Sequence, residues 1–382
     1  MPGNALAKVD ELYQNREQRA KDLRSQGKKV IGYFCCFPPV EFITALDMVP
    51  YRIMGSVEEP ITQADTYLET IMCPFIRSAF DLGLKGRYDF FDGLVVPHSC
   101  DVVQRIYDIW RYHCNVDYTH FINVPHMLQP SSYEFFREEL SLFKRSLEKF
   151  AGHEISDQRL RQAIQLHNEN RSLLRELYEL RKPDPPLISG TEVAKLLIVV
   201  MSIPVREANE LLQSVITEVR NRGNGPRQKH TRVLIYGCEI DDIAFVQLVE
   251  ECGANVVIDD LSVGTRYFWD DVEETDGLLD GLAVRYLEKI RCPRTYRERT
   301  GTHQDDIAKR FSYLRDFAKD FNVNTVILYI IRFCDTHELD VPDVRDYLQE
   351  IGLPVLHLED DYSVTTIGQL RTRIEAFMEM ID

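Results

Sequence analysis

The feature that most constrains this chain is a repeated alternation of short apolar runs with stretches of helical periodicity. In the N-terminal part the apolar runs are "KKVIGYFCCFPP", "PYRIMG", "DGLVVPHS" and "DYTHFINVPH". The rhythm returns later in "TRVLIYGCE", "NVVIDD", "VNTVILYIIRFCD" and "LPVLHLEDDY". Strands separated by helices favour parallel pairing. The sequence therefore predicts an α/β protein with two parallel-sheet domains of the Rossmann-like or flavodoxin-like kind.

The expected domain boundaries lie where this alternation of strand and helix patterns stops. Residues 1–28 are largely polar and predict an N-terminal helix, and residues 29–131 predict the first α/β domain. Over 132–228, apolar residues recur at helix spacing and then give way to "NRGNGPRQKH", which predicts a helical segment followed by a linker. Residues 229–382 predict the second α/β domain.

Charge and hydropathy argue against several classes of protein. The formal net charge of −16 argues against nucleic acid as a partner, because neutralising phosphates needs a basic surface. The longest apolar stretches, such as "VNTVILYIIRF", are too short to span a bilayer, and the polar N-terminus does not resemble a signal peptide. We therefore expect a cytoplasmic protein with no membrane partner, whose nine cysteines are not disulfides.

Three cysteines occupy positions where a ligand site is expected. Cys100 follows "GLVVP" and Cys334 follows "TVILYII", so both lie beyond the carboxyl end of a predicted strand, where open α/β sheets bind ligands. They belong to different predicted domains, and a cleft between the domains would bring them together. Cys73 directly precedes a predicted helix, whose N-terminus favours a thiolate.

Three thiolates on separate segments fit an iron–sulfur cluster better than a structural zinc ion. Zinc sites usually pair their ligands in CxxC units, and the chain has none. Spacing alone does not choose the ligands, since Cys35, Cys36 and Cys238 also follow predicted strands. Packing cysteines and an isolated catalytic thiol therefore stay open as alternatives. The remaining cysteines, expected to be packing or surface residues, are Cys114, Cys252 and Cys292.

Several longer segments resemble, nearly end to end, the family of 2-hydroxyacyl-CoA dehydratases and benzoyl-CoA reductases. The likeness rests on "VIGYFCCFPPVEFITALDMVPYRIMG", "MCPFIRSAFDLGLKGRYDFFDGLVVPHSCD", "GCEIDD", "VVIDDLSVGTRYF" and the C-terminal stretch from "RFCDTHELD" to "RTRIEAFMEMI". The resemblance implies a [4Fe–4S] cluster held by Cys73, Cys100 and Cys334, and so selects among the cysteines where spacing does not. Those that then become core residues or neighbours of the ligands are Cys35, Cys36 and Cys238.

Within the family, "CDVVQRIYDIWRYH" and "EDDYSVTTIGQLRTRIEAF" look most like the smaller cluster-bearing subunit of ATP-dependent benzoyl-CoA reductase. That resemblance implies a dearomatising reduction of benzoyl-CoA to cyclohexadienoyl-CoA, in which this subunit relays electrons and forms part of the active-site wall. The implied partners are a larger homologous cluster-bearing subunit, ATP-hydrolysing activator subunits and ferredoxin, with benzoyl-CoA or another acyl-CoA as substrate. The chain has no GxxxxGK[ST] phosphate loop, which agrees with ATP hydrolysis on another subunit.

Two other functions stay open. The chain could be the small subunit of a 2-hydroxyacyl-CoA dehydratase, which recycles one electron while water leaves the substrate. It could also be a cluster-free scaffold subunit, whose cysteines only pack.

Candidates beyond the cysteines each have a functional and a structural interpretation. Glu41 could approach a substrate pocket or act as a helix N-terminal carboxylate, and His98 could donate to a cluster sulfur or simply end a strand. Arg77 could offset cluster charge or pair with a carboxylate, and Asp101 and Asp335 could cap their loops. The residues that could face CoA, a partner subunit or only their own loop are Asp259, Asp260 and Arg266.

Overall fold

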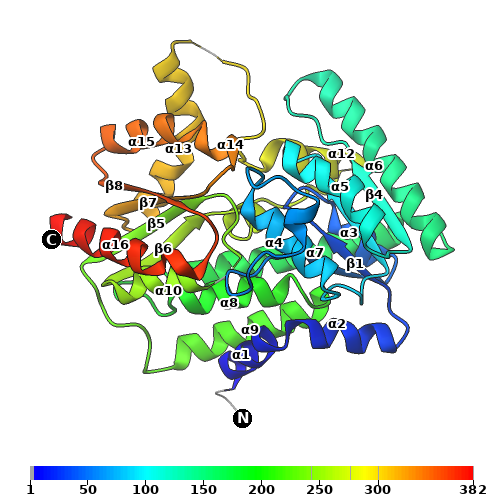
Figure 1. The fold of residues 1–382 in the computed structure, drawn as a ribbon, viewed down its shortest axis with the longest axis horizontal. Helices are drawn as coiled ribbons and strands as arrows, with labels where there is room; N and C mark the ends of the chain where they lie inside the picture. The colour runs from blue at the N-terminus through cyan, green and yellow to red at the C-terminus, as the bar shows by residue number, and fades with distance from the viewer. Residues whose placement is uncertain (1–3, 242, 276, 300, 382) are drawn as a thin grey trace.

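The computed structural model of the chain describes residues 4–241, 243–275, 277–299 and 301–381. Among these residues, eight strands form two sheets of four strands each, and every strand pair is parallel. The two sheets lie side by side, with helices packed around both (Figure 1). The α/β class with two Rossmann-like sheets, predicted from the sequence, is confirmed.

The first sheet has the strand order β2-β1-β3-β4. Its central strand β1 (Val30–Tyr33) is buried throughout, which explains why its sequence is apolar rather than alternating. Gly32 is required there, because a Cβ atom at this position would stand 2.5 Å from the ring of Phe91. The other strands of this sheet are β2 (Val49–Arg52), β3 (Gly93–Pro97) and β4 (Tyr118–Ile122).

The N-terminal segment forms two helices instead of the single helix that its composition predicts. α1 (Ala5–Gln14) ends and α2 (Arg16–Ser25) begins on either side of Asn15. Asparagine is a poor residue for a helix interior, because its side chain competes for backbone hydrogen bonds. The remaining helices of the N-terminal part are α3 (Val40–Ala45), the 3₁₀ turn η1 (Ala64–Thr66), α4 (Pro74–Leu84), α5 (Asp101–His113) and α6 (Pro130–Ala151).

A middle layer of three helices joins the two sheets. α7 (Asp157–Glu179) packs against α3 of the first part and also against α11 (Thr265–Phe268) of the second. α8 (Gly190–Val200) packs against β6 of the second sheet and against α1, and α9 (Val205–Asn221) packs against α7 and α1. In Figure 1, α8 and α9 run below the two sheets, and these contacts leave neither sheet as an isolated body.

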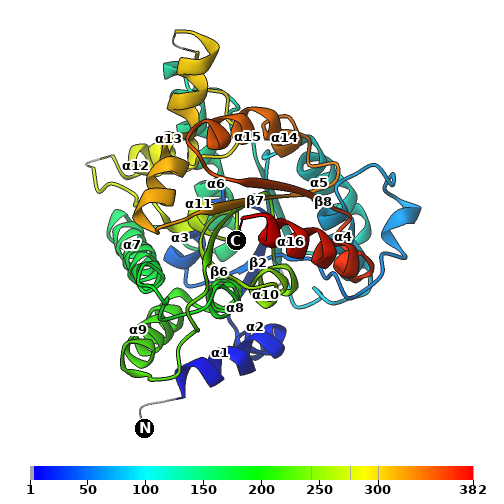
Figure 2. The ribbon, with the colours of Figure 1, turned by 90° about the vertical axis from the view of Figure 1, so that its left-hand side faces the viewer.

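The second sheet has the order β6-β5-β7-β8. Figure 2 shows α10 and α16 on one face of it and α13 and α15 on the other. Its strands are β5 (Thr231–Gly237), β6 (Ala254–Asp260), β7 (Thr325–Ile331) and β8 (Val355–Asp360). Its other elements are α10 (Ala244–Glu251), α12 (Leu278–Val284), the π-helical turn η2 (Arg285–Lys289), α13 (His303–Asp320), α14 (Asp335–Glu338), α15 (Val341–Glu350), the 3₁₀ turn η3 (Val364–Thr366) and α16 (Ile367–Ile381).

The carboxyl edges of the two sheets meet. Arg52 is the last residue of β2, and its Nη2 donates to both carboxylate oxygens of Glu239, at 2.8 and 2.9 Å, just after β5. Nearby, the backbone N–H of Gly55 donates to Asp241 at 2.6 Å. Ligands of parallel α/β sheets bind at this edge, so the junction between the sheets is the place to look for a site.

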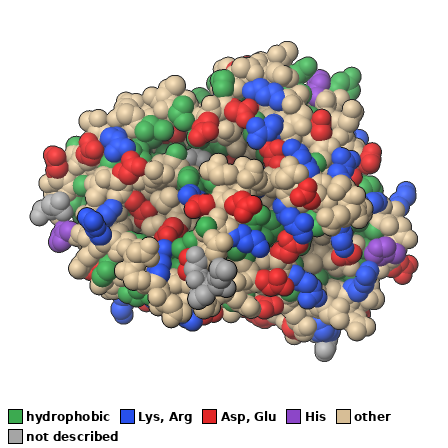
Figure 3. All heavy atoms as spheres, turned by 90° about the horizontal axis from the view of Figure 1, so that it is seen from below, with side chains coloured by type: hydrophobic (Ala, Val, Ile, Leu, Met, Phe, Trp, Pro, Cys, Tyr) green, Lys and Arg blue, Asp and Glu red, His purple; other side chains and the backbone are tan. Residues whose placement is uncertain are grey.

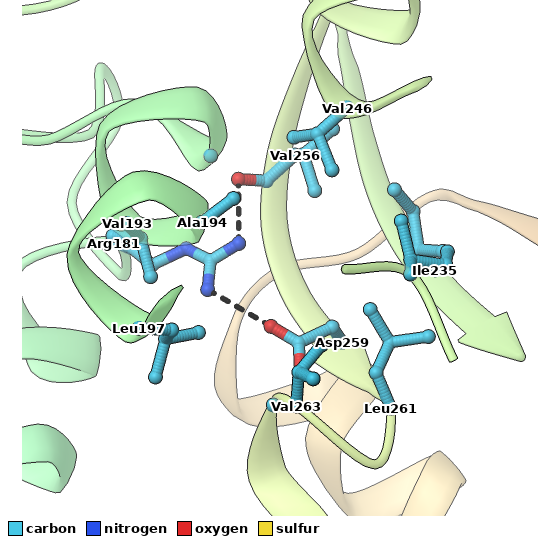
Figure 4. A pocket seen from close by; sticks show the side chains of 13 residues that line it. Arg181, Val193, Ala194, Leu197, Ile235, Val246, Val256, Asp259, Leu261 and Val263 are labelled. Atoms are coloured by element: carbon cyan, nitrogen blue, oxygen red, sulfur yellow. Dashed lines mark hydrogen bonds and ion pairs between the residues drawn. The ribbon is translucent and has the colours of Figure 1, made fainter. Parts of the chain in front are cut away.

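Arg181 attaches the middle layer to the second sheet. Its guanidinium donates to the carbonyl of Val256 at 3.0 Å and lies 3.3 Å from the carboxylate of Asp259 (Figure 4). The cavity beside it, of about 20 Å³, has room for about one water molecule and no ligand. We therefore assign this cavity a structural role.

Acidic and basic side chains are interspersed over the face seen in Figure 3. Within the described ranges, no helix combines the length and the apolar character needed to cross a bilayer.

Candidate functional site

The three cysteines singled out by the sequence each precede the first turn of a helix. Cys100 lies between β3 and α5, Cys334 between β7 and α14, and Cys73 directly before Pro74 of α4. Proline at a first helical position leaves no backbone N–H to satisfy. Each thiol therefore lies where a helix dipole favours negative charge.

The three thiols lie in one neighbourhood. Burial raises the pKa of Cys73, and the charges of Cys238 and Cys100 raise it further. A hydrogen bond with Cys238 raises the pKa of Cys334 most, followed by burial and by the charges of Cys73 and Cys100. Burial raises the pKa of Cys100 to about 12. Without a metal the three residues are thus neutral thiols, which would release protons on binding one.

Four more cysteines surround this group. The Sγ of Cys238 accepts the N–H of Ile331 at 3.5 Å, from the end of β7. The charges of Cys35 and Cys292 both act on Cys100. Cys35 has a left-handed backbone, with φ 60°, unusual outside glycine. The seven cysteines that converge at the junction of the sheets are Cys35, Cys36, Cys73, Cys100, Cys238, Cys292 and Cys334.

Two buried arginines accompany the thiols. The pKa of Cys35 is lowered to about 7, first by a hydrogen bond from Cys36 and then by the charge of Arg52, against the effect of burial. Arg294 donates to the carbonyls of His98 and Val124, at 3.0 and 2.9 Å. Burial lowers its pKa, and the charges of Cys292, Cys35 and Cys100 oppose that shift. These guanidiniums provide positive charge where thiolates would add negative charge.

Three thiols on separate segments form a donor set that could hold a metal cluster. Among the described residues, no three His, Cys, Asp or Glu side chains are arranged to hold one metal ion. In a [4Fe–4S] cluster each thiolate binds a different iron, so its ligands stand farther apart than those of one ion. Thiols on three separate helix starts, close enough to perturb one another's pKa, suit that requirement.

Glu41 lies in a buried ion pair. One carboxylate oxygen accepts from Arg171 of α7 at 2.5 Å, and the other accepts from the hydroxyl of Tyr286 at 2.8 Å. Burial alone would raise the pKa of Glu41, but the charge and hydrogen bond of Arg171 hold it below its ordinary value of 4.5. Protein groups donate hydrogen bonds to both oxygens. Glu41, in the first turn of α3, therefore has a structural role.

His98 lies beside a second histidine. Its Nδ1 is 3.1 Å from Oδ1 of Asn123, and its Nε2 is 3.4 Å from Nε2 of His126. Within the described residues, no hydrogen bond joins His98 to a cysteine. The histidine that does contact a sulfur is His337, whose Nδ1 lies 3.4 Å from Sγ of Cys334. His337 was not among the sequence candidates, although it stands three residues after that cysteine.

The remaining candidates have local partners. Arg77 pairs with Asp65 at 2.5 Å, Asp101 is exposed at the start of α5, and Asp335 is exposed at the start of α14. The side chains after β6 bind within the fold: Asp259 accepts from Thr265 at 3.1 Å, Asp260 accepts from Tyr313 at 2.6 Å, and Arg266 lies 2.9 Å from Asp260.

Comparison with known proteins extends these observations. Residues 35–381 match the family described as 2-hydroxyglutaryl-CoA dehydratase, D-component. The putative dehydratase subunit YjiM of Escherichia coli (strain K12) is 29% identical over 94% of this chain and 93% of its own length. A benzoyl-CoA reductase subunit of Thauera aromatica is 26% identical, with 98% and 97% covered. (R)-2-hydroxyglutaryl-CoA dehydratase subunit beta of Acidaminococcus fermentans is 24% identical, with 94% of each chain covered.

We expect Glu41→Gln to lower the free energy of unfolding by about 3 kcal/mol at pH 7, because it leaves Arg171 buried without its anion. A carboxyl whose folded pKa is depressed stabilises the fold above its unfolded pKa. The difference between wild type and variant should therefore shrink as pH falls below 4.5. Urea unfolding at several pH values measures it.

Asp47→Asn is the matched control, since Asp47 pairs with Lys28 at an exposed position where 71% of its side chain is accessible. It should change stability by less than about 1 kcal/mol. Equal effects of the two substitutions would contradict a structural role for the buried pair.

Proposed function

We propose that this chain, which belongs to the family of 2-hydroxyacyl-CoA dehydratase and benzoyl-CoA reductase subunits, holds a [4Fe–4S] cluster through Cys73, Cys100 and Cys334. The observation that carries the proposal is the convergence of these thiols, from three distant helix starts, at the junction of the two carboxyl sheet edges. Three protein thiolates leave one iron of such a cluster open to another ligand.

The chain's own residues would set the environment of that cluster. When bound, the cluster would supply or accept single electrons. Apolar residues pack against the partly exposed thiols, and Arg294 fixes the loop before Cys100 by donating to the carbonyl of His98. His337 stands within reach of the sulfur of Cys334. Burial and hydrogen bonds to the sulfurs are the means by which a protein tunes such a cluster.

The first candidate for the whole enzyme is an ATP-dependent, ferredoxin-driven benzoyl-CoA reductase. In it this chain would relay electrons and form part of the active-site wall, beside a larger homologous cluster-bearing subunit. Activator subunits would hydrolyse ATP, because the chain has no P-loop sequence. The likeness to the benzoyl-CoA reductase subunit of Thauera aromatica, over nearly the full length of both chains, supports this candidate.

The second candidate is the small subunit of a 2-hydroxyacyl-CoA dehydratase. The description of the matching family and the 29% identity to a putative dehydratase subunit favour it. The same three thiols would hold the cluster in both cases, so the proposed ligand set does not depend on the branch.

We expect Cys73→Ser, Cys100→Ser and Cys334→Ser each to remove most of the iron and acid-labile sulfide from anaerobically purified protein. Each substitution removes a thiolate that no other residue of its segment replaces. The measurement is iron and sulfide analysis per chain, with circular dichroism to confirm that the variants are folded.

The matched controls are Cys114→Ser and Cys252→Ser, because these thiols lie away from the converging group and interact with Asp89 and with Arg371. They should keep full cluster content. Full content in the three ligand variants, or wild-type protein free of iron, would refute the cluster proposal and leave the cysteines as packing residues.

Electron stoichiometry separates the two branches. In the complete anaerobic system the reductase consumes two electrons for each cyclohexadienoyl-CoA formed, whereas the dehydratase has no net consumption. With benzoyl-CoA as the substrate, we expect ferredoxin to give up two electrons for each molecule of product formed. Turnover of a 2-hydroxyacyl-CoA after a catalytic amount of reductant would assign the chain to the dehydratase branch instead.

A further inference from the structure

A cleft of about 710 Å³ opens beside the converging cysteines. One wall is α13, and the other is the segment of residues 288–298, which begins within η2. Tyr236, at the end of β5, and Cys292 also line it. Its volume is in the range typical of small-molecule sites.

Two arginines in this cleft have no carboxylate partner. Arg291 stands over the ring of Tyr313, with its Cζ 4.9 Å from the ring centroid. Arg297 donates from Nη2 to the backbone carbonyl of Glu288 at 2.7 Å. Both arginines line the cleft; burial lowers the pKa of Arg297, and the positive charge of Arg291 lowers it further. Within the described ranges, neither forms an ion pair with a carboxylate.

Three of the six acidic side chains in the lining face an arginine. Asp340 pairs with Arg310 at 2.7 Å, and Asp316 pairs with Arg315 at 2.9 Å. Glu288 accepts a hydrogen bond from Tyr133 at 2.9 Å, and Asp306 faces Arg299 at 3.9 Å. The other acidic residues of the lining are Asp270 and Glu298. Arg291 and Arg297 can therefore meet an anionic group, beside the negative charge that Glu288, Asp270 and Glu298 add to the same lining.

Two buried hydroxyls in the same lining have no hydrogen-bond partner among the described residues. They belong to Tyr236, which is 1% exposed, and Thr295, which is 5% exposed. A buried polar group without a partner costs free energy, and such groups are usually satisfied by water or a ligand. Both can accept or donate, so they suit a phosphate or carbonyl oxygen.

The inner end of the cleft adjoins the proposed cluster ligands. Cys292 lines the cleft, and its charge acts on Cys100. The ring of Tyr236 lies 6.0 Å from that of His337, which in turn contacts the sulfur of Cys334. A ligand in this cleft would extend from Arg291 and Arg297 toward the thiols.

We infer that this chain itself binds a phosphorylated small molecule in the cleft, with Arg291 and Arg297 on the phosphate and Tyr236 and Thr295 on acceptor oxygens nearer the thiols. The ligand's identity as a coenzyme A thioester rests on the proposed function. With a coenzyme A thioester as the ligand, the chain contacts the substrate as well as relaying electrons. An arginine pair is well suited to phosphate, because guanidinium donors match its oxygens.

Isothermal titration calorimetry of the anaerobic protein tests this inference, with coenzyme A, ADP and inorganic pyrophosphate as probes. Arg291→Met and Arg297→Met should each raise the Kd for coenzyme A by about tenfold or more. Arg299→Met is the matched control, since Arg299 carries the same charge on the same segment but is largely exposed and does not line the cleft. It should leave the Kd unchanged.

Tyr236→Phe gives a readout that a purely structural role would not produce. Removing an unpaired buried hydroxyl should not lower the Tm, but it should weaken ligand binding several-fold. Tighter binding of coenzyme A than of ADP would identify a thioester site, whereas equal binding would identify a nucleotide site. Absence of binding, or equal weakening by Arg299→Met, would overturn the inference.

Calorimetry also keeps this inference separate from the cluster proposal. Binding by protein without iron would leave the cleft assignment standing and refute the cluster. Iron-loaded protein that binds none of the three probes would refute the cleft assignment and leave the cluster proposal standing.

Discussion

The carboxyl edges of the two sheets face each other, and this arrangement positions the cysteines and the cleft. Arg52 ends a strand of one sheet, Glu239 follows a strand of the other, and their ion pair is buried between them. Removing one partner of such a pair leaves an uncompensated charge in the interior. The pair joins the two edges, and their meeting brings residues from strand ends far apart in the sequence to one place.

The chemistry of the junction follows from that orientation. Parallel strands deliver their following loops to the same edge, and here those loops carry cysteines after β1, β3, β5 and β7. Burial raises the pKa of the Cys73 and Cys100 thiols, while Arg52 and Arg294 supply charge that compensates thiolates. The cleft with Arg291 and Arg297 opens from the same junction, so a redox site and a ligand site would share one wall.

Much of this was predictable from the sequence, because strand–helix alternation and residues at strand ends are local patterns. The α/β class and the position of Cys100 and Cys334 beyond strand ends were predicted in this way. Cys292 was not, since it follows a π-helical turn in a segment with no strand signal. The pairing of Glu41 with Arg171 was also not predictable, because it joins residues 130 positions apart that only the packing of α3 on α7 brings together.

An anaerobic crystal structure with anomalous data at the iron edge would show whether the junction holds a cluster. We expect a compact group of iron peaks bonded to the sulfurs of Cys73, Cys100 and Cys334, at the junction between the sheets. Iron bound by other residues, or an anomalous map without peaks there in protein that still supports turnover, would contradict this expectation.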